Sequence, residues 1–111
     1  MAIVSSMKGG NGTLNRGMFV MEKRISEVLA RHKVRLVRLE ISKLFGNILL
    51  IVAAPHVQLR FVRDRGYNSC EVCKRNDGLH WEDDMLSASL RFCNLPDFCD
   101  FVDRVLTAKS L

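Results

Sequence analysis

Apolar residues in the first third of the chain recur at intervals of three and four positions, the period of an amphipathic helix. They are Met18, Met21, Ile25, Val28 and Leu29, with charged residues between them. This spacing predicts a helix over residues 18–32. Residues 1–17 are rich in Ser, Gly and Asn, so we expect them to form a flexible extension of a single domain over residues 18–111.

A second amphipathic helix is predicted near the end of the sequence. Its apolar face consists of Leu95, Phe98, Phe101, Val102, Val105 and Leu106. Asn94 is a candidate N-cap and Pro96 fits the first turn, so we expect this helix over residues 95–107. Before it, Asp83 or Asp84 could cap a short helix that carries Met85, Leu86 and Leu90.

Between the helices, apolar residues alternate with polar ones or form short continuous runs, as they do in strands. Strands are expected at 34–41, 48–54, 57–63 and 68–74. The apolar phase changes within the first of them, which predicts a bulge near residues 36–37. The run ILLIVAA at 48–54 is apolar throughout, as is typical of a central strand. The segment around Trp81 has no clear type.

The order of these elements predicts a two-layer α+β domain. About four strands should form an antiparallel meander, with the N-terminal and C-terminal helices packed on one face of the sheet. The length of 111 residues fits a single domain of this kind. Ala53, Val62 and Phe92 could leave apolar surface on the second face of the sheet, which would allow a homodimer.

Composition and charge restrict the function only broadly. The formal net charge is +5, which favours an anionic partner such as nucleic acid or an acidic protein face. The longest apolar run, residues 48–54, is too short to cross a bilayer, and residues 1–17 contain no apolar secretory segment. We therefore expect a cytoplasmic protein without a membrane partner.

Cysteine and histidine positions provide the first test for chemistry. Cys70 and Cys73 have the CxxC spacing of a zinc knuckle, whereas Cys93 and Cys99 are separated by five residues and do not form a second such pair. A strand would also point Cys70 and Cys73 to opposite faces. Free thiols are the favoured interpretation and a zinc site is the alternative, so neither a metal nor a cofactor is expected. None of the three histidines lies in a nucleophile–base motif, so we assign no catalytic residues and expect no enzyme activity.

The most charged part of the strand region is LRFVRDRGYN, residues 59–68. Leu59 and Phe61 should face the core and Arg60 should face away from it, before a tight turn. The candidate partner-binding residues are Arg60, Arg63, Asp64, Arg65, Tyr67 and Trp81, because Arg, Tyr and Trp are favoured anchors of protein interfaces. The alternative is a solvated polar face in which Asp64 pairs with a neighbouring arginine and Trp81 belongs to the core.

A small basic nucleic-acid-binding accessory protein is the alternative function. Phosphates could be contacted by the basic residues on or beside this hairpin, which are Arg60, Arg63, Arg65, Lys74 and Arg75, and by Arg35 and Arg38 on a neighbouring strand. Single-strand binding surfaces usually offer several stacking aromatic residues. In this hairpin Tyr67 is the only exposed candidate, which makes nucleic acid the less favoured partner.

The segment from Phe45 to Gly66 carries a family resemblance. It contains a Phe-Gly-Asn turn, an apolar strand, a short break and a strand ending in Arg-Phe-Val-Arg-Asp-Arg-Gly, and a tryptophan follows one strand later. The pattern resembles a group of small bacterial proteins that are similar to immunity proteins of toxin and interbacterial-conflict loci. The resemblance covers roughly residues 20–107, with its specific part at 45–66, and the stretch from Tyr67 to Cys70 is more polar than the pattern.

The resemblance implies a compact α+β domain that acts by binding a partner protein, in the manner of an antitoxin, and it implies no catalytic residues. The expected function is therefore a non-enzymatic protein-binding module of a bacterial defence system, with a toxin or another component of that system as its partner.

Overall fold

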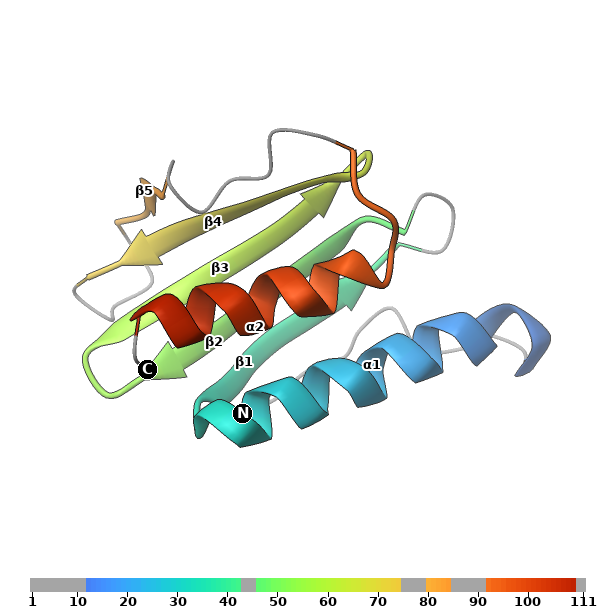
Figure 1. The fold of residues 1–111 in the computed structure, drawn as a ribbon, viewed down its shortest axis with the longest axis horizontal. Coiled ribbons are helices and arrows are strands. Elements are labelled where there is room, and N and C mark those ends of the chain that lie inside the picture. Colours follow the sequence, from blue (N-terminus) through green and yellow to red (C-terminus); the bar gives the residue numbers. More distant parts are fainter. Residues whose placement is uncertain (1–11, 43–45, 75–79, 85–91, 110–111) are drawn as a thin grey trace.

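The computed structural model describes residues 12–42, 46–74, 80–84 and 92–109, without the side chains of residues 12–19. The chain forms a two-layer α+β domain, as the sequence predicts. A five-stranded antiparallel sheet has the order β1-β2-β3-β4-β5, and both helices lie on one of its faces (Figure 1). The elements are α1 (Gly12–His32), β1 (Arg35–Ile41), β2 (Ile48–Ala54), β3 (Val57–Asp64), β4 (Tyr67–Cys73), β5 (Glu82–Asp83) and α2 (Asp97–Lys109).

Most element boundaries agree with the expected ones to within two residues. The register of β1 against β2 shifts between Leu36 and Arg38, which confirms the predicted bulge. One expectation was wrong. Helix α1 begins at Gly12 rather than at Met18, so residues 12–17 belong to the helix; glycine lowers helix propensity by about 1 kcal/mol but does not forbid a helix. Asp83 lies in a fifth strand, β5, and the short helix expected to carry Met85, Leu86 and Leu90 lies outside the described residues.

The face of the sheet toward the helices forms the hydrophobic core. Leu50, Phe61 and Cys70 are neighbours across β2, β3 and β4 and all are buried. The Phe61 ring meets the edge of the Phe101 ring of α2 at a centroid distance of 6.0 Å. The alternation of side chains in a strand places these residues on one face, because intervening positions on β3, such as Arg60 and Val62, point to the other side.

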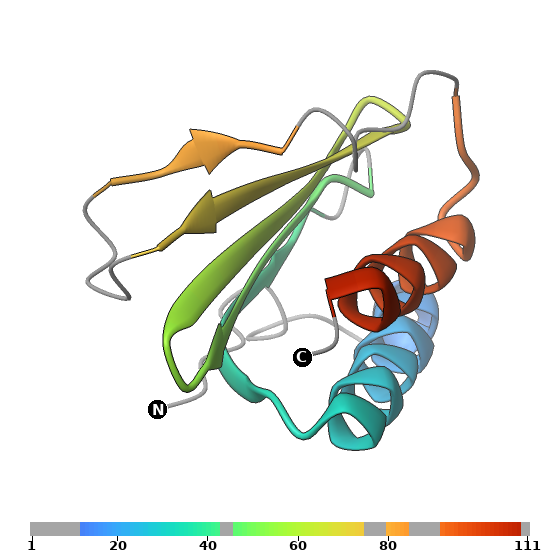
Figure 2. The ribbon, with the colours of Figure 1, turned by 60° about the vertical axis from the view of Figure 1, so that its left-hand side comes forward.

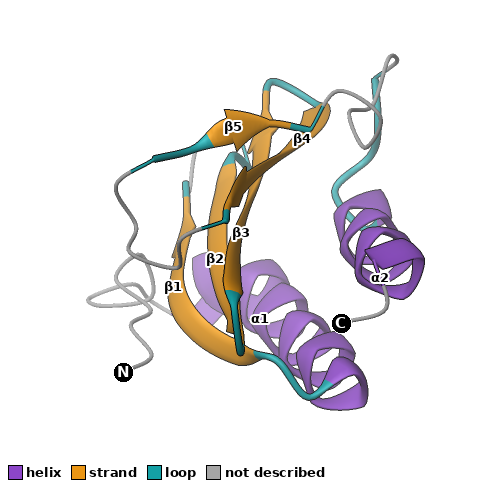
Figure 3. Cartoon of the chain, turned by 90° about the vertical axis from the view of Figure 1, so that its left-hand side faces the viewer, coloured by secondary structure: helices purple, strands orange, loops and turns teal. Residues whose placement is uncertain are grey.

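The two helices also contact each other, as Figure 2 shows from the side. The His32 ring at the end of α1 lies 2.7 Å from an Asp103 carboxylate oxygen of α2, and the Cys99 Sγ donates to Met21 Sδ at 3.2 Å. Neither described helix has an apolar stretch of the length needed to span a membrane. The two described helices cover the same face, and no described helix lies on the opposite face of the sheet (Figure 3).

Candidate partner-binding face

The sheet surface turned away from both helices is called the open face below. Its side chains form rows across the strands, set by the antiparallel register. One row contains Glu40, Leu49, Val62 and Ser69, and the next contains Arg38, Ile51, Arg60 and Glu71. A third row, at the end of the sheet nearest the β3–β4 turn, contains Asn47, Asp64 and Tyr67.

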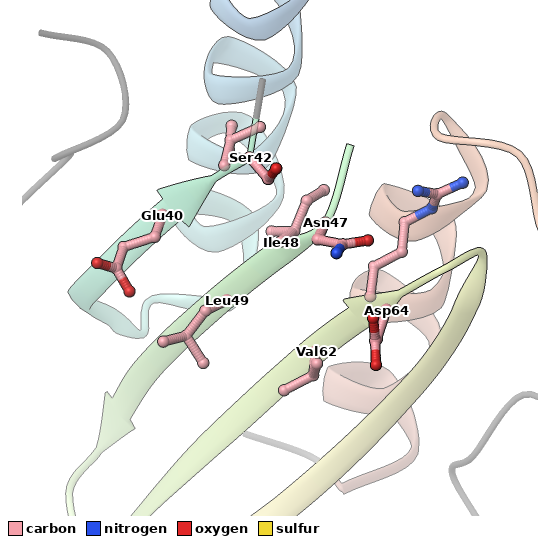
Figure 4. A pocket seen from close by; sticks show the side chains of 9 residues that line it. Glu40, Ser42, Asn47, Ile48, Leu49, Val62 and Asp64 are labelled. Atoms are coloured by element: carbon pink, nitrogen blue, oxygen red, sulfur yellow. The ribbon is translucent and has the colours of Figure 1, made fainter. Parts of the chain in front are cut away.

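An apolar stripe occupies the middle of the open face. It consists of Leu49, Ile51 and Val62, which are half-buried and do not belong to the core cluster. Leu49 and Val62 are directly paired across β2 and β3, and Figure 4 shows them side by side on the open face. Ala53, the expected fourth apolar residue here, is buried and adds little exposed surface. Partly exposed apolar side chains flanked by polar ones are typical of surfaces that bind another macromolecule.

Beside the stripe, Arg60 is held in a fixed position. Its Nε and one terminal nitrogen donate to the two carboxylate oxygens of Glu71, at 2.8 Å and 2.7 Å. The hydrogen bond to Glu71 raises the pKa of Arg60 above its ordinary value, against a smaller opposing effect of burial. The Trp81 ring lies over the guanidinium, 4.4 Å from its carbon to the ring centroid. A bidentate pair and a cation–π contact therefore orient Trp81 in the unbound protein.

Arg63 lies on the other side of the sheet, so its assignment to an exposed charged surface was wrong. It is 6% exposed and donates to the backbone carbonyls of Gly46 at 3.0 Å and Cys93 at 2.9 Å. It has the same strand phase as Leu59 and Phe61, which are buried on the helix side. Arg63 therefore joins the start of β2 to the segment that leads into α2, and it is not available to a partner.

The β3–β4 turn displays the remaining candidates. Arg65 and Gly66 both have positive φ, 54° and 90°, the backbone combination of a two-residue type I′ hairpin turn. The Arg65 amide donates to Asn47 Oδ1 at 2.9 Å. A Cβ at Gly66 would also meet the ring of Phe92, which would have to move aside.

The turn also carries an exposed aromatic pair. Tyr67 is 51% exposed and Phe92 is 62% exposed, and their rings meet edge to face at a centroid distance of 6.4 Å. Asp64 is paired with Tyr67 across the hairpin and is exposed. Candidate residues therefore occupy two places on or beside the open face: Arg60 and Trp81 near its middle, and Asp64, Arg65 and Tyr67 at one end.

A pocket of about 440 Å³ lies between the ends of β1, β2 and β3, and Asp64 is the one open-face candidate that lines it (Figure 4). Its apolar lining consists of Leu49 and Val62 of the open face with Ile41 and Ile48 of the helix side, and its polar lining consists of Glu40, Ser42, Asn47, Arg63 and Asp64. It gives the open face a concave part beside the apolar stripe, which a protruding side chain of another molecule can enter.

The two cysteines of the CxxC pair, Cys70 and Cys73, do not point to the same side of the sheet. Cys70 pairs with Phe61 on the helix side, and Cys73, which pairs with Gln58, lies on the other face, as a spacing of three in a strand requires. Burial raises the pKa of the Cys70 thiol to about 12 and also raises the pKa of Cys99, which makes both thiols poor nucleophiles near neutral pH. In the part of the chain that the structure describes, no group of three or more His, Cys, Asp or Glu side chains is placed to hold a metal ion.

Sequence reasoning missed several residues of the open face. Glu71, which fixes Arg60, was not a candidate, although its alternation with Cys70 and Val72 places it opposite Arg60 once the hairpin register is known. Leu49 and Ile51 were not candidates, because the ILLIVAA run is apolar throughout and its pattern does not distinguish one face of β2 from the other. Comparison of the chain with protein-family models, curated proteins and solved structures finds no match.

Proposed function

We propose that this chain is a non-enzymatic protein-binding module of the immunity-protein type, and that it binds a partner protein of a bacterial conflict or defence system through its open face. The partner is a toxin or another component of that system. Binding would occur in the cytoplasm, and it requires neither a cofactor nor a metal.

The observation that carries this proposal is the combination of the apolar stripe with the fixed Arg60–Trp81 stack. Protein interfaces gain most of their affinity from a few aromatic and arginine anchors near a desolvated centre. Arg60, Glu71 and Trp81 are already held together before binding, so a partner loses little conformational entropy in ordering them. Leu49, Ile51 and Val62 lie next to them and supply apolar area.

The same contacts favour a protein over nucleic acid. Of the basic residues that suggested phosphate binding, Arg60, Arg38 and Lys74 are paired with Glu71, Glu40 and Glu82, and Arg63 is buried. Arg35 and Arg65 are exposed, and Arg75 lies outside the described residues. A surface for single-stranded nucleic acid combines several unpaired cations with several stacking aromatic residues. The open face instead presents alternating charges around an apolar centre.

The test is capture of the partner from the native host, followed by measurement with the purified partner. The informative variant is Trp81→Ala, and the matched control is Arg104→Ala, which removes an exposed cation from α2 on the opposite side of the sheet. We expect Trp81→Ala to weaken binding by about 2 kcal/mol or more, which is about a 30-fold loss, and Arg104→Ala to leave it unchanged. Equal effects of the two variants would remove the open face from the proposal.

A second measurement separates the two functions. Fluorescence anisotropy with single-stranded and double-stranded oligonucleotides of mixed sequence, at low salt, should show no binding that depends on Arg60 and Arg65. Salt-sensitive binding that is lost in an Arg60→Ala/Arg65→Ala variant would indicate that the partner is nucleic acid and not a protein.

A further inference from the structure

The charges of the open face are arranged so that the face is complementary to itself. Arg38 and Glu40 lie on β1 in adjacent rows, with the apolar residues Ile51 and Leu49 beside them on β2. Arg38 donates to Glu40 at 2.8 Å, and the two side chains keep 50% and 34% of their surface exposed. In each row, one charged residue of β1 therefore lies beside one apolar residue of β2.

We propose that two copies of this chain pair through their open faces about a two-fold axis that lies between the sheets and runs across the strands. Such an axis, placed between the two rows, exchanges them. It sets Leu49 of one copy against Ile51 of the other and Arg38 of one copy against Glu40 of the other. Both contacts occur twice, as in any isologous dimer. Two antiparallel sheets packed face to face about 10 Å apart are a common arrangement.

The charges favour this arrangement over packing about an axis along β2. An axis along β2 would keep the rows in register and would bring β1 of one copy over β3 of the other. That packing places Arg38 against Arg60, since both belong to the same row, and like charges facing each other oppose association. The axis across the strands instead replaces each exposed intramolecular pair by a network of two arginines and two glutamates.

The two parts of the surface have different tasks in the dimer. Burial of Leu49 and Ile51, which face each other in the dimer, supplies the affinity, because removal of apolar surface from water is the main driving force of association. Val62 of each copy faces Arg60 of the other copy. Exposed ion pairs contribute little to affinity, so the Arg38–Glu40 contacts mainly determine the orientation of the copies. Only three partly exposed apolar residues form the stripe, which is consistent with a weak, reversible dimer.

Self-association of this kind would regulate partner binding, because it covers Trp81 and the stripe at the same time. This consequence rests on the proposed function, whereas the dimer itself does not. The dimer is measured on the purified chain alone, so its failure leaves the partner proposal standing, and the failure of partner capture leaves the dimer standing.

The first experiment is sedimentation equilibrium of the full chain over a wide range of concentration. The wild type should show a reversible monomer–dimer equilibrium, and Ile51→Asp should shift it to the monomer, because a carboxylate would be buried in the interface. The control, Arg104→Asp, introduces a carboxylate on α2 and should dimerise as the wild type does. A wild type that is monomeric at every concentration would overturn the proposal, and so would a dimer that Ile51→Asp leaves intact.

The second experiment tests the orientation by charge reversal. Arg38→Glu leaves two carboxylates facing each other at each contact, and Glu40→Arg leaves two guanidinium groups facing each other, so each variant alone should dimerise about tenfold more weakly than the wild type. Mixed in equal amounts, the two variants form a pair in which both contacts are attractive again, and affinity should return to within about threefold of the wild type. The exposure of both side chains makes folding insensitive to these changes, and circular dichroism checks it. A mixture no tighter than the single variants would rule out this axis.

Discussion

Arg60 and Arg63 lie three residues apart on the same strand, and their environments are opposite. Arg60 lies on the open face, 28% exposed, where Glu71 and Trp81 hold it. Arg63 lies on the helix side, 6% exposed, where it donates to two backbone carbonyls. The difference shows that strand phase, and not the charge of a residue, decides which side of this sheet its side chain occupies. The helix side contributes mainly to stability, and the open face is free to contribute to binding.

The largest difference between the two faces should be in the loss of unfolding free energy when an apolar residue is truncated. Phe61→Ala removes a fully buried ring from the helix side and should lower the free energy of unfolding by about 3–5 kcal/mol. Val62→Ala, one position along β3 on the open face, should cost about 1 kcal/mol or less. Urea denaturation of both variants measures the difference. Similar losses would mean that the open face is covered as fully as the core.

The two arginines provide the next comparison. Arg63→Ala removes the donor for the carbonyls of Gly46 and Cys93 and should lower the free energy of unfolding by about 2–3 kcal/mol. Arg60→Ala breaks a pair that solvent still reaches, and should cost about 1 kcal/mol or less. Arg63→Lys is the matched control: it keeps the charge but cannot reproduce the planar fork, so we expect an intermediate loss. The comparison fails if Arg60→Ala is the more destabilising change.

The free energy of unfolding at high pH tests whether the Cys70 thiol is buried on the helix side of the sheet. Burial raises the pKa of Cys70 to about 12, so the folded protein keeps this proton at pH values where the unfolded chain has lost it. This contribution to stability is complete below the unfolded pKa and is lost as the pH rises from about 9 to 12. At pH 10, roughly 1.4 kcal/mol of it has been lost. Denaturation at pH 7 and pH 10 should therefore show a smaller loss for Cys70→Ala than for the wild type. An identical loss in both proteins would contradict the burial of this thiol.

The smallest expected effect is the interaction energy between Arg60 and Trp81 on the open face. A double-mutant cycle with Arg60→Met and Trp81→Ala should give a coupling energy of about 0.5–1 kcal/mol. Circular dichroism is the suitable probe, because Trp81 is the only tryptophan. The same Trp81→Ala variant is expected to lose partner binding, so its effects on stability and on binding should differ strongly. A coupling energy near zero would mean that Arg60 does not hold Trp81 in position.

Particular residues show how far sequence reasoning reached. The meander, the bulge near Leu36 and the helix end at His32 follow from apolar periodicity, and the structure confirms them. The phase of β3 already placed Arg63 with Leu59 and Phe61, but grouping the arginines by charge led to the wrong side of the sheet. Strand β5 has only two residues, which is too short for any periodicity to reveal.

What the sequence determined by itself is therefore the set of elements and the side of each strand that faces inward, because both depend on local spacing of apolar residues. Only the tertiary structure decided which residues meet. The register of β3 on β4 sets Glu71 against Arg60, the return of the chain as β5 brings Trp81 over that pair, and the approach of the segment before α2 gives Arg63 the carbonyl of Cys93. These contacts join positions far apart in the chain, and pairing across a sheet depends on the geometry of the whole fold, which no local pattern encodes.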